Sequence, residues 1–160
     1  MNIVQKFAEL IRQAIANDII KNFKFTEIES FSTIHNYIDV ENKILRKGAI
    51  SAQEGEKIII PLNMRDGCLI CVGKGNEEWN CSAPHGAGRA YNRADTTNSF
   101  TLSQYKKEMK GIYSTSISRD TLDECPMAYK NSQTIIDLIE PTAEIVERLK
   151  PVYNYKEGAR

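Results

Sequence analysis

Ser82–Arg89 reads Ser-Ala-Pro-His-Gly-Ala-Gly-Arg and places one histidine between a proline and two glycines. Pro84 fixes its own φ and favours an extended conformation for the residue before it. Gly86 and Gly88 allow backbone turns that are closed to other residues, and they let the backbone approach a ligand closely. The stretch therefore predicts a stiff approach to His85 and a tight exit lined with backbone N–H groups.

The same loop predicts a site for an anion. Successive backbone N–H groups in such a turn can form an anion-binding nest. Arg89 adds a planar guanidinium whose paired donors match a phosphate group. The loop thus offers an imidazole for nucleophilic or acid–base chemistry, an anion cradle and a cation. The alternative interpretation is a glycine-rich turn that happens to hold a histidine.

Length and composition indicate one globular domain. The chain has 160 residues, of which 41% are hydrophobic and 26% charged, so it can build a sizeable core. Lys plus Arg equals Asp plus Glu, 21 each, so the net charge gives no argument for nucleic-acid binding, although a local basic site stays open. No apolar run approaches the roughly 20 residues of a membrane span, and the N-terminus lacks the pattern of a signal peptide.

The four cysteines point to a reduced, cytoplasmic setting, because no secretion signal accompanies them. Cys68 and Cys71 have the spacing of a redox motif, but they lie in an apolar run typical of a buried strand. At that spacing in a strand the two side chains point to opposite faces, which argues against a redox pair. No second cysteine pair is present to complete a zinc site.

Outward from the histidine loop, the pattern predicts an α+β fold: mixed β-strands with a few packed helices in a single domain. Apolar residues at helical spacing over 3–22 predict an amphipathic helix that buries one stripe. Residues 27–38 favour an extended segment with His35 and Asn36 at its end. A single histidine there is more typical of a structural role than of a metal ligand.

Further elements follow from propensity and from chain breakers. Strands are predicted over 43–50 with an end at Gly48, over 57–61 with a stop at Pro61, and over 68–72. Towards the C-terminus we expect a helix at 102–109, a short strand at 112–117, a polar connection at 120–130 and a short helix at 132–139. Residues 145–152 fit a strand or a helix equally well, and the last residues are typical of a frayed end.

Several blocks of the sequence, in this order, resemble the RtcB family of RNA ligases. These blocks are His35–Tyr37, Arg46–Ala49, Ile60–Met64, Gly73–Asn76, Ser82–Arg89, Asp123–Lys130 and the terminal Lys156. The resemblance covers nearly the whole chain. It implies an enzyme that uses GTP and manganese to join RNA 3′-phosphate or 2′,3′-cyclic phosphate ends to RNA 5′-hydroxyl ends. Such enzymes act in tRNA splicing and RNA repair.

The resemblance also implies roles for individual residues. His85 matches the guanylylated histidine, whose ring nitrogen attacks the α-phosphorus of GTP and forms a covalent histidine–GMP intermediate. Neutral imidazole is a good nucleophile near pH 7, and metal ions would screen the phosphate charge. His35 matches a manganese ligand, and Asn36 matches a residue that contacts the nucleotide. The other guanylate-binding positions implied are Pro61, Leu62, Asn63, Met64, Cys68, Gly86, Ala87, Gly88 and Lys156.

The sequence departs from the family pattern in two ways. The common Pro-Gly-Ser-Met turn is Pro-Leu-Asn-Met at Pro61–Met64, and a common serine is replaced by Cys68, whose thiol is a weaker hydrogen-bonding group. In addition, residues 1–160 resemble only a C-terminal portion of the ligase. The remaining metal ligands, an Asp, a Cys and two His, would belong to the family's N-terminal half. Either a separate N-terminal chain supplies that half, or the gene is cut or degenerate. The alternative is a non-catalytic remnant that binds nucleotide or RNA.

Overall fold

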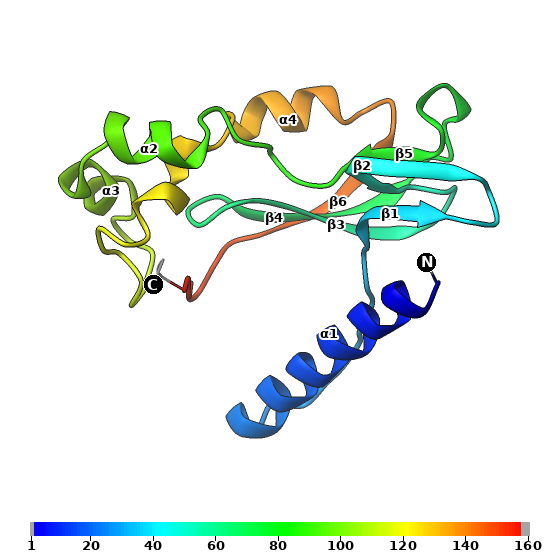
Figure 1. The fold of residues 1–160 in the computed structure, drawn as a ribbon, viewed down its shortest axis with the longest axis horizontal. Helices are drawn as coiled ribbons and strands as arrows, with labels where there is room; N and C mark the ends of the chain where they lie inside the picture. Colours follow the sequence, from blue (N-terminus) through cyan, green and yellow to red (C-terminus); the bar gives the residue numbers. More distant parts are fainter. Residues whose placement is uncertain (1, 158–160) are drawn as a thin grey trace.

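The α+β class is confirmed by the computed structural model, which describes residues 2–157 (Figure 1). Its six strands form two three-stranded antiparallel sheets in the orders β1-β2-β5 and β3-β4-β6. The strands are β1 (His35–Asp39), β2 (Ile44–Ser51), β3 (Lys57–Asn63), β4 (Gly67–Gly73), β5 (Ser82–Pro84) and β6 (Ala143–Leu149). The helices are α1 (Asn2–Phe23), α2 (Arg93–Ser99), α3 (Leu102–Glu108) and α4 (Ser132–Leu138). Short 3-10 turns are η1 (Glu77–Trp79), η2 (Leu122–Glu124) and η3 (Pro126–Ala128).

Two apolar clusters form the core. The larger cluster joins both sheets, because alternate residues of β3, with Ile58 and Ile60 at their centre, meet Ile50 of β2 and Leu69 of β4. The smaller cluster lies under α3 and the 3-10 turns, around the fully buried Tyr105. The two sheets and this helical part are therefore tied into one body, with α4 lying along one side of it (Figure 1).

Both strand ends predicted from chain breakers are wrong. Gly48 lies inside β2 at φ +71°, where the ladder shifts between His35 and Tyr37 and two residues of β1 span four of β2. The glycine therefore forms a bulge instead of an end. Pro61 also lies inside its strand, paired with Cys68. It is tolerated there because β3 is an edge strand of its sheet, where a residue without an N–H loses no ladder bond.

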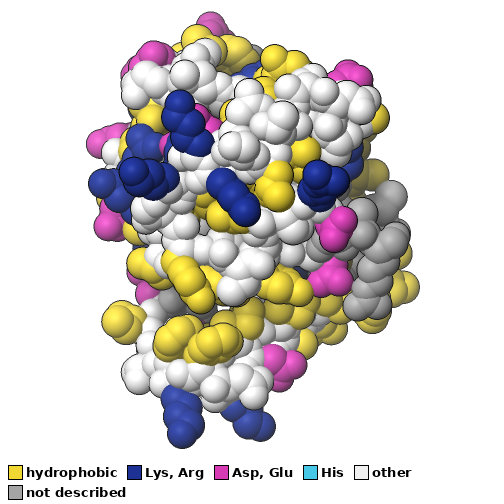
Figure 2. Space-filling model, turned by 90° about the vertical axis from the view of Figure 1, so that its left-hand side faces the viewer, with side chains coloured by type: hydrophobic (Ala, Val, Ile, Leu, Met, Phe, Trp, Pro, Cys, Tyr) yellow, Lys and Arg dark blue, Asp and Glu magenta, His cyan; other side chains and the backbone are white. Residues whose placement is uncertain are grey.

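The predicted N-terminal helix is present as α1, but the prediction that it buries a stripe is wrong. Its large apolar side chains are exposed: Ile3, Val4, Phe7, Leu10, Ile11, Ile15, Ile19 and Phe23. The helix stands apart from the body in Figure 1, and Figure 2 shows hydrophobic side chains at its level in the lower part of the molecule. The Ile38 N–H donates to Gln5 Oε1 across 3.0 Å, which ties α1 to the edge of β1. The amphipathic pattern predicted the helix correctly, but within residues 2–157 no apolar face packs against its stripe.

Some of the remaining predicted helices and strands are confirmed by the structure and others are wrong. The helices predicted at 102–109 and 132–139 are confirmed as α3 and α4, and the ambiguous segment near 145–152 is strand β6. The extended segment over 27–38 becomes a regular strand only from His35. The strand predicted at 112–117 is wrong, because only an isolated bridge joins Ser114 to Asn154. Helix α2 was missed, since its polar sequence has no apolar period. No helix in the described part of the chain is long and apolar enough to cross a membrane.

Candidate functional site

The His85 loop connects the two sheets. It leaves β5 after Pro84, and the His85 N–H donates to the carbonyl of Gly48 in β2 at 3.4 Å. Two residues later the Ala87 N–H donates to the carbonyl of Pro61 in β3 at 3.1 Å. A Cβ on Gly86 would lie 2.9 Å from that carbonyl oxygen, so only glycine permits this approach. Backbone contacts to β2 and β3 therefore fix the loop on both sides of Gly86.

The bulge in β2 supports the imidazole of His85. The Gly48 N–H donates to Asn36 Oδ1 at 2.6 Å, which ties the start of β1 to the bulge. The Cδ2–Nε2 edge of His85 lies over Gly48, 3.8–3.9 Å from where a Cβ would stand. The rings of His35 and His85 stack with centroids 5.2 Å apart and planes 6° apart. The structure thus brings together three residues that the sequence singled out: His35, Asn36 and His85.

The environment of His85 favours the neutral imidazole. Burial lowers its pKa below the ordinary value of 6.5, and the nearby His35 ring lowers the pKa further. Both effects disfavour the charged form, one by desolvation and the other by like-charge repulsion. At neutral pH His85 therefore keeps a ring nitrogen with a free lone pair, as a nucleophile requires.

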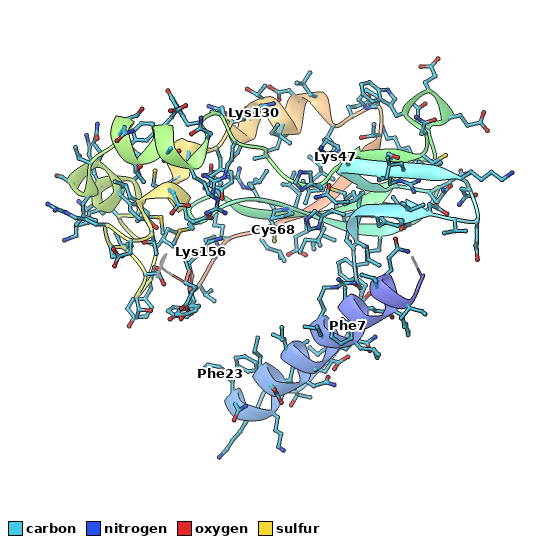
Figure 3. The ribbon with its side chains drawn as sticks, in the orientation of Figure 1. Phe7, Phe23, Lys47, Cys68, Lys130 and Lys156 are labelled. Carbon is cyan, nitrogen blue, oxygen red and sulfur yellow. The ribbon has the colours of Figure 1, made fainter. Side chains whose placement is uncertain are left out.

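A cavity of about 690 Å³ opens beside the His85 loop, within the size range of ligand pockets. Most residues implied as guanylate-binding line it: Pro61, Leu62, Asn63, Met64, Cys68, His85, Gly86, Ala87, Gly88 and Lys156. Figure 3 shows Cys68 on β4 and Lys156 on the C-terminal segment, which reach this cavity from separate elements. His35 and Asn36 instead line a neighbouring cavity of about 500 Å³ beside α1.

The backbone of the loop carries unpaired donors. The N–H groups of Gly86, Gly88 and Arg89 have no hydrogen-bond acceptor within residues 2–157. All three residues line the larger cavity, and Gly88 has the positive φ of +70° expected of such a turn. Unpaired N–H groups of this kind need a partner from solvent or ligand. The arrangement is compatible with the anion nest that the sequence predicted.

The guanidinium of Arg89 is not directed at an open phosphate site. Its Nη1 donates to the carbonyl of Asp123 at 2.7 Å, and its Nη2 pairs with Glu124 Oε1 at 2.5 Å. The group also lies over the ring of Tyr129, 5.1 Å from the centroid. Arg89 thus contributes its backbone N–H to the loop, while its side chain holds the neighbouring segment in place.

Glu124 is a residue that the sequence interpretation missed as a site residue. It is largely buried, and its Oε2 accepts from the Tyr129 hydroxyl at 2.8 Å and pairs with Lys156 Nζ at 3.2 Å. Burial alone would raise the Glu124 pKa, but the Tyr129 hydrogen bond and the charge of Lys156 outweigh it and lower the pKa. Burial and the same contact raise the pKa of Tyr129 to about 12. Both residues lie in Asp123–Lys130, one of the blocks that carry the family resemblance, and this position was the one sequence signal that could have pointed to Glu124.

The C-terminal segment is ordered through Lys156, in contrast to a frayed end. The Lys156 N–H donates to Ser116 Oγ at 2.8 Å, and Asn154 Nδ2 donates to the Met64 carbonyl at 2.8 Å. By contrast, the amide of Asn63 is used within its own turn. Its Oδ1 accepts the Asp66 N–H at 2.9 Å and its Nδ2 donates to Asp66 Oδ2 at 2.8 Å. Asn63 therefore borders the cavity with a side chain that already has partners.

The described residues do not by themselves fit a manganese site. Among residues 2–157, no group of three or more His, Cys, Asp or Glu side chains is placed to hold a metal ion. The rings of His35 and His85 also lie in nearly parallel, separated planes, so an ion in the plane of one ring lies outside the plane of the other, and their lone pairs do not converge on it. A divalent site needs several convergent ligands. The thiol of Cys68 adds little, since burial raises its pKa and disfavours the thiolate.

Comparison with known proteins gives a consistent result. The family model described as tRNA-splicing ligase RtcB matches residues 1–157. The RNA-splicing ligase RtcB of Escherichia coli (strain K12) is 30% identical over 148 residues, covering 88% of this chain and 36% of the relative. The tRNA-splicing ligase RtcB of Aeropyrum pernix is 32% identical over 105 residues, covering 61% of this chain and 22% of the relative. The chain thus spans about a third or less of the length of these relatives.

Proposed function

Because this chain belongs to the RtcB family of RNA-splicing ligases, we propose that it carries the guanylate-accepting part of such a ligase. The observation that carries the proposal is the cavity whose wall is the His85 loop. That wall combines a neutral imidazole, three unpaired N–H groups and, across the cavity, the ammonium of Lys156. These groups suit a ligand that has a phosphate at one end and a hydrogen-bonding base at the other.

In the proposed reaction, His85 is the nucleophile. Its neutral ring nitrogen attacks the α-phosphorus of GTP, a P–N bond forms and pyrophosphate leaves. The unpaired N–H groups of Gly86 and Gly88, which border the cavity, would stabilise the negative charge of the phosphate. The 3′-phosphate of one RNA then accepts GMP, which frees His85. The 5′-hydroxyl of a second RNA displaces GMP and forms the phosphodiester bond.

Manganese binding in this proposal needs ligands from a second protein segment. GTP and manganese are the proposed cofactors, and His35 is the one ligand that this chain would contribute. A separate N-terminal half of the ligase would supply the remaining ligands. The exposed apolar stripe of α1 is the surface we assign to that half, because the cavity containing His35 lies directly beside α1. The cytoplasmic setting inferred from the cysteines belongs to the same proposal.

The alternative function is a non-catalytic remnant that binds nucleotide or RNA. The lack of a group of three or more metal-ligating side chains among residues 2–157 is compatible with both functions. The two functions differ in whether a covalent bond to His85 forms when the missing half is supplied. A remnant would bind guanine nucleotide without covalent labelling under any condition.

The deciding experiment is labelling with GTP carrying a radioactive α-phosphate. The chain is mixed with manganese and the N-terminal half of the Escherichia coli relative, and the labelled protein is counted. We expect a label that acid removes and base spares, as for a phosphoramidate, and that His85→Ala abolishes. An acid-stable label, or full labelling of the His85→Ala chain, would overturn the nucleophile assignment. Binding without any label would favour the remnant.

A further inference from the structure

Glu124 links four donor side chains next to the cavity. Its carboxylate contacts Arg89 and Arg93 through Oε1, and Tyr129 and Lys156 through Oε2. The Glu124 side chain is only 12% exposed, so solvent screens its contacts less than it screens those of a surface ion pair. We propose that Glu124 is a positioning residue, which holds Lys156 so that the cavity selects guanine over adenine. The inference rests on the proposed function.

Glu124 acts through its partners and does not touch the ligand space. The cavity is lined by Arg89, Tyr129 and Lys156, whereas Glu124 lies behind them. Lys156 comes from the C-terminal segment, and Tyr129 follows η3, so the carboxylate joins two parts of the chain that share no helix or strand. Without Glu124 the Lys156 side chain would have no ion-pair partner among residues 2–157. Its position therefore depends on this one carboxylate.

Chemistry gives Lys156 a means to discriminate between purines. An ammonium has three donors and no acceptor, and Glu124 engages it through one oxygen. Guanine presents the O6 acceptor at the position where adenine presents an N6 amino donor. An ammonium held at that edge therefore attracts guanine and is unmatched against adenine. An ammonium free to move would follow either base with less preference.

Glu124→Gln should keep the contact with Arg89 and lose the contact with Lys156. The amide keeps the shape of the side chain but has one acceptor oxygen where the carboxylate has two. Two guanidinium groups face Oε1, and neither can accept a hydrogen bond from an amide NH2. The oxygen should therefore turn toward Arg89 and Arg93, and the NH2 toward Tyr129, whose hydroxyl can accept, and toward Lys156, which cannot. The substitution should release Lys156 while keeping Arg89 in place.

The first arm of the test measures binding of GMP and AMP to the whole chain by calorimetry. Loss of one charge-assisted hydrogen bond should reduce the GMP/AMP preference of Glu124→Gln by about tenfold. Lys156→Met should lose a similar factor, and the double variant should lose no more than either single variant. Arg93→Ala is the matched control, because Arg93 contacts Glu124 but lines no part of the cavity. A general folding defect would weaken both nucleotides equally.

The second arm needs no nucleotide. The mobility of the Lys156 ammonium is measured from the 15N relaxation of its Nζ, with the signal assigned by its absence in Lys156→Met. We expect higher mobility in Glu124→Gln and near wild-type mobility in Glu124→Asp and Arg93→Ala. Unchanged mobility in Glu124→Gln would overturn the inference whatever the function. If the wild-type chain binds no guanine nucleotide even when the N-terminal half is added, the proposed function fails, while the mobility measurement still decides whether Glu124 holds Lys156.

Discussion

The rings of His35 and His85 stack face to face, with their centroids 5.2 Å apart and their planes 6° apart. His35 starts β1, and His85 lies in the loop after β5. Both strands pair with β2 in one sheet, which brings the two histidines together. Two like titratable rings at this distance cannot both become charged without repulsion. The stacking is therefore an electrostatic feature as well as a packing contact.

The titration of His85 should reveal this coupling. We expect an NMR midpoint below 6.5 for His85, because burial and His35 both lower its pKa. His35→Gln removes the neighbouring charge and should move the midpoint upward, part of the way to the ordinary value. Unfolded chains protonate His85 more readily than folded chains, so this residue's contribution to stability is complete above about pH 6.5 and declines below it. An unchanged midpoint in His35→Gln would show that burial alone acts on His85.

Gly48→Ala should destabilise the fold and disturb His85. The residue has φ +71°, a region that costs other residues about 1–2 kcal/mol. Urea unfolding would measure this loss, and the NMR titration of His85 would show the local effect. Gly55→Ala is the matched control, since Gly55 has φ +77° in the turn between β2 and β3, with no atoms near its Cβ position. Both variants should lose similar stability, but only Gly48→Ala should shift the His85 signals.

Gly86→Ala tests the docking of the loop onto β3. Its Cβ would meet the Pro61 carbonyl oxygen at 2.9 Å, so the loop must move away and the hydrogen bond from Ala87 must lengthen. We expect a loss of about 1–3 kcal/mol in urea unfolding, as for an overpacked site. Hydrogen exchange at the Ala87 amide should accelerate. Wild-type exchange at that amide together with unchanged stability would contradict the described contact.

The surface of α1 should matter for association and little for the stability of the chain itself. Phe7 is 63% exposed and Ile15 is 55% exposed, so replacing both by Ser should change the free energy of unfolding by less than about 1 kcal/mol. The same variant should bind the N-terminal half of a relative more weakly in sedimentation experiments. Lys21→Gln on the same helix is the control. Unweakened binding by the double variant would remove α1 from the proposed interface.

The chain alone should bind manganese weakly. No cluster of three or more suitable ligands exists among residues 2–157, and His35 and His85 do not converge on one point. Calorimetric titration should therefore give no tight stoichiometric site, and binding should strengthen when the N-terminal half is added. Tight one-to-one binding by the isolated chain would contradict the view that its site is incomplete.

Local sequence signals predict most helices and strands, but they do not show whether a proline or glycine ends a strand or lies within it. Pro61 and Gly48 each predict a strand end, because both residues disfavour a regular ladder. The first is accommodated by an edge position and the second by a bulge, and both depend on pairing with distant residues. The apolar stripe of α1 predicts a buried face, because periodicity shows that one side of the helix is apolar. Periodicity does not show what covers that face.

The candidate site was predictable in part for the same reason. The loop around His85 has a local signature, so its conformation and its contact with a cavity could be predicted. The role of Lys156 came from family resemblance, and the structure places that residue at the same cavity. Glu124 escaped notice because its importance lies in contacts separated by 35 residues from Arg89 and by 32 from Lys156. Pairings of that kind arise from tertiary packing and leave no pattern in a short window.

The hydrogen bond between Ala87 and Pro61 also has a consequence for solubility. The side of β3 that faces away from β4 carries backbone groups that could recruit a strand from another molecule. Thr33 Oγ1 accepts from the Ile59 N–H on that strand at 3.1 Å, and the loop amide occupies the Pro61 carbonyl. The loop that presents His85 thus also shields an open sheet edge. Substitutions that detach this loop should promote aggregation through strand pairing, in addition to displacing His85.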